Sequence, residues 1–153
     1  MDINTRIFGQ ISIEDDKLIH FPQGIVGFPE LTDFAIVHDS DQGDQAGIRW
    51  MQSVQEPGFA MPVIDPLMVV ADYNPVVDDE LLKTIGGLED VLVLVTITVP
   101  SDLTKMTVNL KAPFVINVAE KKACQVILEQ DLQVKFPIYD ILQKRKQEAK
   151  AGE

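Results

Sequence analysis

Residues 91–99 read Val-Leu-Val-Leu-Val-Thr-Ile-Thr-Val, and this stretch decides the fold class of the chain. Its odd positions, from Val91 to Val99, are all β-branched, whereas its even positions change from leucine to threonine. Because a strand points alternate side chains to opposite faces, one face is wholly apolar and the other becomes polar along its length. β-Branched side chains are stiff at χ1 and fit a pleated surface. The stretch therefore predicts a strand, and residues 106–110, 112–118 and 124–128 predict its neighbours in a meander.

Similar patterns upstream predict further strands, at residues 4–13, 18–21, 33–39, 48–54, 59–64 and 67–71. We expect the segment 18–21 to return against 4–13 as a hairpin. Proline cannot donate a ladder hydrogen bond, so Pro62 predicts a sheet edge or a bulge. A short helix is predicted at about 78–86. An aspartate can cap its start, acidic side chains suit the positive end of the helix dipole, and glycine ends it.

Pro137 allows a second helix from Ile138 to about Ala149, where Ile138, Ile141 and Leu142 would dock and the charged end would fray. The sequence thus predicts a mainly β single domain over residues 1–136. A C-terminal helix or frayed tail is predicted over residues 137–153.

The charge of the chain is strongly negative and uneven. The net charge is −11, and residues 1–104 hold 18 acidic but only four basic side chains. Such a surface repels nucleic acid and lipid headgroups and attracts basic partners, although acidity also simply keeps a protein soluble. The chain shows neither a signal peptide nor an apolar run long enough to span a membrane, so we expect a cytoplasmic protein.

Motifs for catalysis or for cofactor binding do not stand out. The two histidines, His20 and His38, each lie within a strand pattern, and the single cysteine, Cys124, lies in an apolar run that predicts burial. Residues 39–44 resemble a calcium loop, but glycine occupies the fifth position, where an oxygen ligand belongs, and Trp50 the twelfth. These absences argue against an enzyme, a cofactor and a metal site without excluding them.

Four stretches together resemble one known family, the flagellar assembly factor FliW. They run, in order, Ile-His-Phe-Pro-Gln-Gly-Ile-Val-Gly-Phe-Pro-Glu at 19–30, Met-Gln-Ser at 51–53 followed by Phe59, Pro62 and Asp65-Pro66, Thr-Val-Asn-Leu-Lys-Ala-Pro-Phe-Val-Ile-Asn at 107–117, and Gln-Val-Ile-Leu at 125–128. The resemblance extends from about Thr5 to Leu128, and the order, spacing and total length make the joint match specific.

This resemblance implies a small, compact, antiparallel β-barrel-like protein with a short helix and no enzymatic activity. FliW proteins bind flagellin before its export, in the manner of a chaperone. They also bind CsrA, the RNA-binding translational regulator, and stop it from repressing flagellin translation. The family is described as contacting CsrA away from its RNA-binding surface. The resemblance therefore implies an allosteric CsrA antagonist that couples flagellin translation to secretion and binds neither nucleic acid nor a membrane.

Exposed acids are the predicted contacts for a basic regulator, with an aromatic anchor among them. The candidate protein-binding residues are Asp15, Asp16, Asp72, Tyr73, Asp78, Asp79 and Glu80. Tyr73 is also compatible with a half-buried position at the end of a strand. The polar and glycine residues of the family stretches are expected to maintain the fold; they are Gly24, Gly27, Gln52, Asn109, Pro113 and Asn117.

Two alternatives remain open at this stage. A small ligand-binding or enzymatic β-barrel would explain the glycine-rich loop at 22–30 and the many carboxylates, and a fully packed barrel interior would argue against it. An acidic nucleic-acid mimic would occupy an RNA-binding site directly and displace RNA competitively. An allosteric antagonist would instead give a noncompetitive pattern.

Overall fold

The computed structural model describes residues 2–6, 9–14, 17–37, 48–77, 79–83, 85–86 and 91–144. The strands are β1 Asp2–Thr5, β2 Gly9–Ser12, β3 Leu18–His20, β4 Asp33–Val37, β5 Ile48–Ser53, β6 Ala60–Ile64, β7 Val91–Thr98, β8 Thr107–Val108, β9 Phe114–Asn117, β10 Lys122–Gln125 and β11 Phe136–Pro137. The short helices are η2 Pro66–Met68, α1 Asp79–Lys83 and η3 Leu103–Lys105. Residues 139–144 are also helical. No helix within these ranges is long and apolar enough to cross a membrane.

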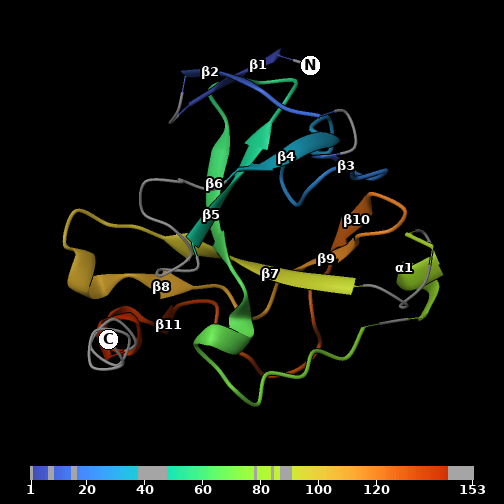
Figure 1. Ribbon diagram of the computed structural model, residues 1–153. Coiled ribbons are helices and arrows are strands. Elements are labelled where there is room, and N and C mark those ends of the chain that lie inside the picture. Colours follow the sequence, from blue (N-terminus) through green and yellow to red (C-terminus); the bar gives the residue numbers. More distant parts are fainter. Residues whose placement is uncertain are drawn as a thin grey trace, which may run out of the picture.

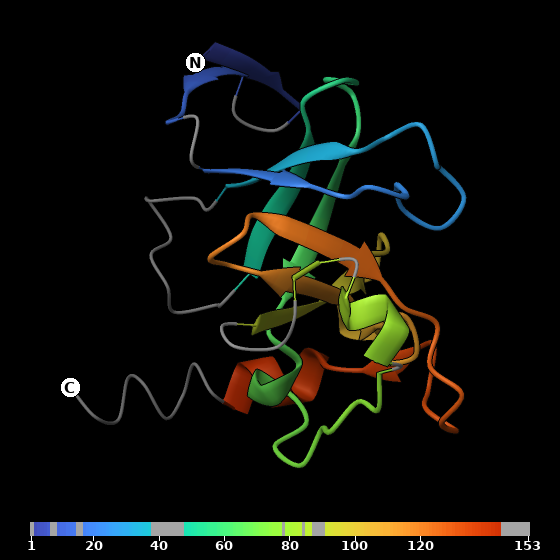
Figure 2. The same ribbon diagram turned by 90° about the vertical axis from the view of Figure 1, so that its right-hand side faces the viewer.

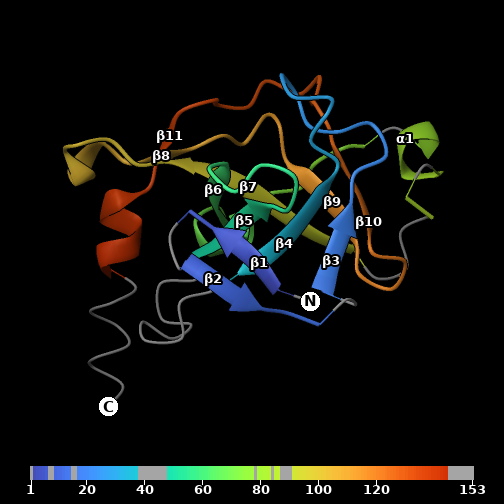
Figure 3. The same ribbon diagram turned by 90° about the horizontal axis from the view of Figure 1, so that it is seen from above.

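Seven strands close into a barrel, in the order β3, β4, β5, β6, β7, β9, β10 (Figures 1 and 3). Every pairing between them is antiparallel except the one that completes the barrel, where Lys122 of β10 pairs in parallel with His20 of β3. The amide of His20 also donates to the carbonyl oxygen of Lys121 at 2.9 Å. The predicted mainly β, antiparallel barrel with one short helix is confirmed.

The barrel interior is an aromatic and aliphatic core to which all seven strands contribute. Its buried residues are Ile19, Phe21, Ile25, Leu31, Phe34, Met51, Val63, Leu94, Phe114, Ile116 and Ala123. Phe21 packs edge-on against both Phe34 and Phe114, with ring centroids 5.3 and 5.7 Å apart. Edge-to-face pairs of this kind stabilise a core beyond the area that they bury.

A second core lies on the outer side of β6, β7, β9 and β10. The long strand β7 serves both cores, because Leu94 faces the interior while Val95 and Ile97 face outward. This outer core is covered by the segment from η2 to α1, by β8 and β11, and by the C-terminal helical residues (Figure 2). Ile138 is fully buried there, and Ile141 and Leu142 pack against it, as predicted.

Two predicted elements differ in the structure. The predicted strand 4–13 is interrupted, so β1 and β2 pair with each other and form their own two-stranded sheet. Gly9 has a φ of +67°, a left-handed conformation that suits glycine at a turn. Consequently β3 does not return against this segment but pairs with β4.

The predicted strand at 67–71 is wrong as well. The carboxylate of Asp65 accepts a hydrogen bond from the amide of Leu67 at 2.9 Å, and Pro66 occupies the first helical turn, so the chain forms η2. The prediction that Pro62 places its strand at a sheet edge is wrong for β6 as a whole, which lies between β5 and β7. Only the pairing with β7 leaves Pro62 out, because it includes Val63 and Ile64 alone.

Several sequence-predicted features lie outside the described residues. They are Asp15, Asp16, Asp78, His38, the loop at 39–44 that resembles a calcium site, and the tail after residue 144. The predicted helix at 78–86 is confirmed over Asp79–Lys83, and Gly86, with a φ of +94°, follows it as expected.

Candidate protein-binding surface

The chain between β6 and β7 forms an outer wall, and Asp72, Asp79 and Glu80 of the predicted acidic contacts lie on it. The segment leaves η2, crosses the outer core and reaches α1 (Figures 1 and 2). Its inner side is held by buried residues, notably Val69, Tyr73 and Ile85. Asp72, Asp79 and Glu80 are exposed on the same segment. The packing of the apolar residues thus fixes where these carboxylates are displayed.

Tyr73 does not have the surface position that an anchor requires. Its side chain is 8 % exposed, and its hydroxyl donates to the carbonyl oxygen of Leu110 at 2.7 Å. Burial raises the pKa of Tyr73 to about 12, because the phenolate would lose hydration there. The predicted anchor is therefore wrong in its placement, and Tyr73 instead ties the outer wall to the barrel.

An apolar groove lies where this wall meets the chain after β10. Its lining residues are Val76, Val77, Val126, Ile127, Leu128, Glu129 and Gln130, and its volume is about 440 Å³. The side chain of Gln130 joins the two walls: Oε1 accepts from the amide of Val76 at 2.7 Å, and Nε2 donates to the carbonyl oxygen of Asn74 at 3.2 Å. We call these seven residues the acidic groove, because Glu129 is one of them and the exposed Asp131 follows Gln130 in the chain.

The acidic groove combines exposed aliphatic side chains with negative charge. Val76 and Ile127 are 70 % and 61 % exposed, the two highest values among the large hydrophobic residues that the structure describes. Glu129 lies in the groove, and Asp131 follows it on the surface. Asp72 and Asp79 lie four residues before and three residues after Val76 in the sequence. The arrangement suits a partner with a basic surface around an apolar contact.

Val76 and Ile127 were not singled out from the sequence. A signal for Ile127 does exist, because Val126 and Leu128 are buried and alternate with it, so a strand-like segment must present the isoleucine outward. Val76 lacks such a signal: only the fold of the segment 72–77 over the barrel shows which of its valines is covered.

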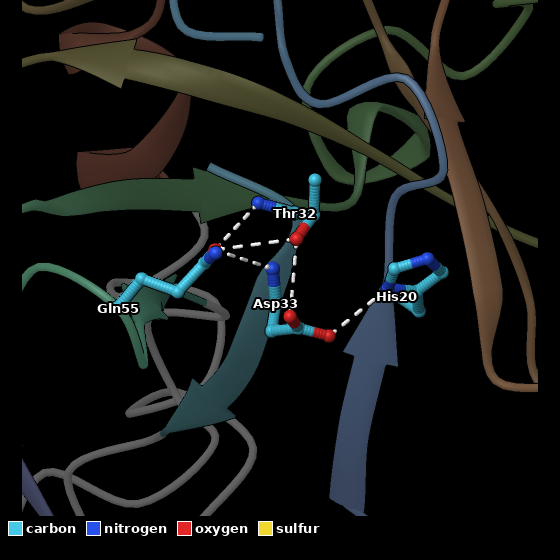
Figure 4. A network of polar contacts seen from close by, with 4 residues as sticks. All are labelled: His20, Thr32, Asp33 and Gln55. Atoms are coloured by element: carbon cyan, nitrogen blue, oxygen red, sulfur yellow. Dashed lines mark hydrogen bonds and ion pairs between the residues drawn. The ribbon is translucent and has the colours of Figure 1, made fainter. Parts of the chain in front are cut away.

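The polar network around His20 is structural in its geometry (Figure 4). His20 Nδ1 lies 3.0 Å from Asp33 Oδ1, and the hydroxyl of Thr32 donates to the other oxygen of the same carboxylate at 3.0 Å. A nucleophilic hydroxyl would have to hydrogen-bond to the base, whereas this hydroxyl bonds to the acid. Gln55 Oε1 accepts from the amides of Thr32 and Asp33 at 2.7 and 3.1 Å, so the network fastens β4 to the turn after β5.

Cys124 is buried, as predicted, at 8 % exposure. Burial raises the pKa of its thiol, which disfavours the thiolate that nucleophilic chemistry needs. Among the described residues, no group of three or more histidine, cysteine, aspartate or glutamate side chains is placed to hold a metal ion.

The family stretches contribute to folding in the way that the sequence analysis expected. Gln52 is 1 % exposed; its Oε1 accepts from the amide of Arg6 at 2.9 Å, and its Nε2 donates to the carbonyl oxygens of Ser53 and Pro57 at 2.9 and 3.0 Å. Asn117 is also buried, and its Oδ1 accepts from the amide of Glu120 at 3.0 Å. Both side chains satisfy backbone groups at turns.

Comparison with known proteins gives one consistent result. A family model described as "FliW protein" matches residues 2–138. A flagellar assembly factor FliW of Lachnoclostridium phytofermentans is 47 % identical over 148 residues, which is 95 % of each chain. A second, of Lachnospira eligens, is 42 % identical over 94 % of this chain and 98 % of its own. The crystal structure of a flagellar assembly factor FliW superposes with a TM-score of 0.81 at 31 % identity, over 90 % of this chain and 96 % of that one. The chain therefore belongs to the FliW family of flagellar assembly factors.

Proposed function

We propose that this protein is a cytoplasmic, non-enzymatic regulator that binds flagellin and a CsrA-type RNA-binding protein, and so couples flagellin translation to secretion. The observation that carries the proposal is family membership over nearly the whole chain. The residues support a binding role, because the buried thiol and the His20 network lack the geometry of a nucleophile and its base.

The acidic groove is the proposed contact for the CsrA-type partner. A protein that holds RNA must be basic, and a net charge of −11 favours its approach to this chain. Charges at the rim of an interface mainly accelerate association, whereas apolar side chains at its centre supply affinity. Val76 and Ile127 provide such a centre, Glu129 lies in the groove, and we assign the charged border to Glu129 together with the exposed Asp72 and Asp79 of the adjoining segment.

The proposed mode of action is allosteric. The negative field of a docked acidic protein would oppose RNA phosphates nearby, in addition to any change in the shape of the regulator. RNA titrations at several fixed concentrations of this protein distinguish the modes. We expect the apparent dissociation constant for RNA to rise and then level off once this protein saturates the regulator, because an allosteric antagonist weakens RNA binding by a fixed factor. A rise that continues in proportion to the concentration of this protein would instead identify an acidic mimic of nucleic acid.

A charge-reversal experiment tests the groove. In the test variant Asp72, Asp79 and Glu129 become lysine; in the control variant Asp2, Glu30 and Glu56, which are exposed on other elements, become lysine. Both variants change the net charge equally. At low ionic strength we expect the test variant to associate with the regulator about tenfold more slowly than the control. Equal rates for the two variants would remove the groove from the proposal.

A mixing experiment tests the partners themselves. Purified protein is titrated calorimetrically with the CsrA-type regulator and with flagellin of the same bacterium at low salt. If neither partner binds at micromolar concentrations, the proposed function is refuted. A titration of flagellin into the preformed complex with the regulator then shows whether the two partners exclude one another.

A further inference from the structure

One end of the barrel contains a second, larger cavity, which shares no lining residue with the acidic groove. The cavity has a volume of about 580 Å³. Aliphatic side chains from β3, β4, β7 and β9 line it, among them Ile19, Ile36, Leu92 and Ile116. The barrel interior is thus packed around its phenylalanines but open at this end. Cavities of this size, apolar and with a few polar groups, are typical of binding sites.

The described residues that line the cavity carry a net positive charge, opposite in sign to that of the protein. They include Lys17, Arg49 and Lys121 but a single acid, Glu14. Residues 1–104 contain only four basic side chains, and two of these four lie in this cavity. Such a concentration of the rare charge at one apolar opening is not expected from a surface whose acidity serves solubility alone.

These cations are not neutralised by neighbouring carboxylates within the described part of the chain. The salt bridge between His20 and Asp33 involves none of the three, and no ion pair is found at Lys17, Arg49 or Lys121 in that part. Like charges beside low-dielectric walls focus the electrostatic field and raise the local concentration of anions. The cavity therefore favours a ligand that has both an apolar body and a negative group.

A strand edge lies beside the cavity. Residues 11–14 line one side in an unbroken run, and the first two of them belong to β2. In the part of the chain that the structure describes, β2 belongs to a two-stranded sheet and pairs with β1 along one edge; its opposite edge has no strand partner there. An exposed strand edge offers backbone hydrogen bonds to an extended peptide. This feature favours a peptide over a lipid-like molecule.

We propose that the barrel-end cavity binds an extended, apolar segment of a partner protein that carries a carboxylate, at a site separate from the acidic groove. The aliphatic floor receives the apolar side chains. The guanidinium of Arg49, which presents parallel donors to a carboxylate, and the two lysines receive the negative group. The two surfaces differ in sign, so each selects a partner that the other repels.

The test uses the full chain and defined probes. The first probe is a hexapeptide of leucine and serine residues that carries a fluorophore on its N-terminal amine and has a free C-terminal carboxylate. The second probe is the same peptide with a C-terminal amide, and dodecanoate serves as a competitor. Fluorescence anisotropy should show the carboxylate peptide binding at least fivefold more tightly than the amide. Equal affinity of the two peptides would overturn the charge assignment.

Matched variants locate the site. Lys17→Glu together with Lys121→Glu should weaken binding of the carboxylate peptide by about tenfold. Lys122→Glu together with Lys135→Glu is the control, because both lysines are exposed, neither lines the cavity, and the net charge changes equally. Circular dichroism establishes that each variant is folded, and Ile36→Ser tests the apolar floor should the charge variants not fold. A loss with the control variant equal to that of the cavity variant would overturn the proposal.

Two further outcomes decide between sources and between sites. Binding of dodecanoate without binding of either peptide would show a site for fatty acids and refute the peptide proposal. The acidic-groove variant should bind the carboxylate peptide undiminished, whereas a parallel loss would show that the two surfaces are one site. Neither outcome bears on binding of the CsrA-type regulator, so failure here is distinguishable from failure of the proposed function.

Discussion

Gly24 and Gly27 form a matched pair that tests why the glycine-rich loop is built as it is. Both adopt left-handed backbone conformations, with φ values of +69° and +88°. A Cβ atom at Gly27 would meet nothing within 4 Å, whereas one at Gly24 would lie 2.5 Å from the carbonyl oxygen of Pro29 and 2.6 Å from its Cα. Alanine at the two positions therefore differs chiefly in one backbone collision.

The expected energies follow from these contacts. A left-handed alanine costs roughly 1 kcal/mol at either position, and the smaller entropy of the unfolded chain offsets about 0.4–1 kcal/mol of that cost. Gly27→Ala should thus lower the free energy of unfolding by less than about 1 kcal/mol. Gly24→Ala adds an overpacking cost of about 1–3 kcal/mol. The loop cannot easily yield, because Ile25 and Phe28 exchange backbone hydrogen bonds of 3.3 and 2.9 Å.

Urea denaturation of both variants, followed by far-ultraviolet circular dichroism, measures the difference. We expect Gly24→Ala to be less stable than Gly27→Ala by about 1–3 kcal/mol, with similar dependence on urea. A difference below about 0.5 kcal/mol, which is within the usual range for harmless surface changes, would show that the loop relaxes around the new methyl group. The steric account of this family stretch would then be refuted.

Three further predictions address the buried polar groups and the groove. Tyr73→Phe removes the hydrogen bond to Leu110 and should cost about 1 kcal/mol at neutral pH. Because the folded-state pKa of Tyr73 is raised to about 12, the unfolded chain releases its proton first, so this side chain's contribution is intact below pH 10 and is lost towards pH 12. The wild type should lose about 2–3 kcal/mol over that interval, and persistence of the same loss in Tyr73→Phe would contradict the assignment. Gln52→Leu leaves the amide of Arg6 and the carbonyl groups of Ser53 and Pro57 without their hydrogen-bond partner, and should lower the free energy of unfolding by about 2–4 kcal/mol. Unchanged hydrogen exchange of the β1–β2 hairpin would show that Gln52 does not hold the hairpin on the barrel. Ile127→Ser should weaken binding of the CsrA-type regulator by about tenfold without loss of stability, since the side chain is exposed; an unchanged dissociation constant would place the contact elsewhere.

Local sequence patterns predicted most of the strands correctly, since alternation is a property of a few consecutive residues. Residues 91–98 form the long strand that serves both cores, and the segments near 33–37, 48–53 and 60–64 are strands as expected. The errors arose where a local hydrogen bond competed with the pattern. The cap of Asp65 on Leu67 converted an apolar run into η2, and a turn at Gly9 divided one predicted strand into two.

The candidate site was predictable only in its chemistry. The excess of acids identified the segment around Asp72 and Asp79, and both residues are exposed there. The chain neighbours of Tyr73 are exposed, yet Tyr73 itself is buried. Its hydroxyl reaches the carbonyl oxygen of Leu110, which is distant in the sequence, so the local pattern could not predict this burial. The groove escaped prediction for the same reason: Val76 and Gln130 are 54 residues apart in the sequence, and a hydrogen bond of 2.7 Å joins them.

By itself the sequence determined the family, the sign of the charge and the mainly β character, because each of these depends on composition, motif order or alternation within one strand. Only the tertiary structure decided that the sheet closes through a single parallel contact between Lys122 and His20, and that Val76 and Ile127 line one groove. Closure brings together strands that are about a hundred residues apart, and pairings over such separations leave no local periodicity in the chain.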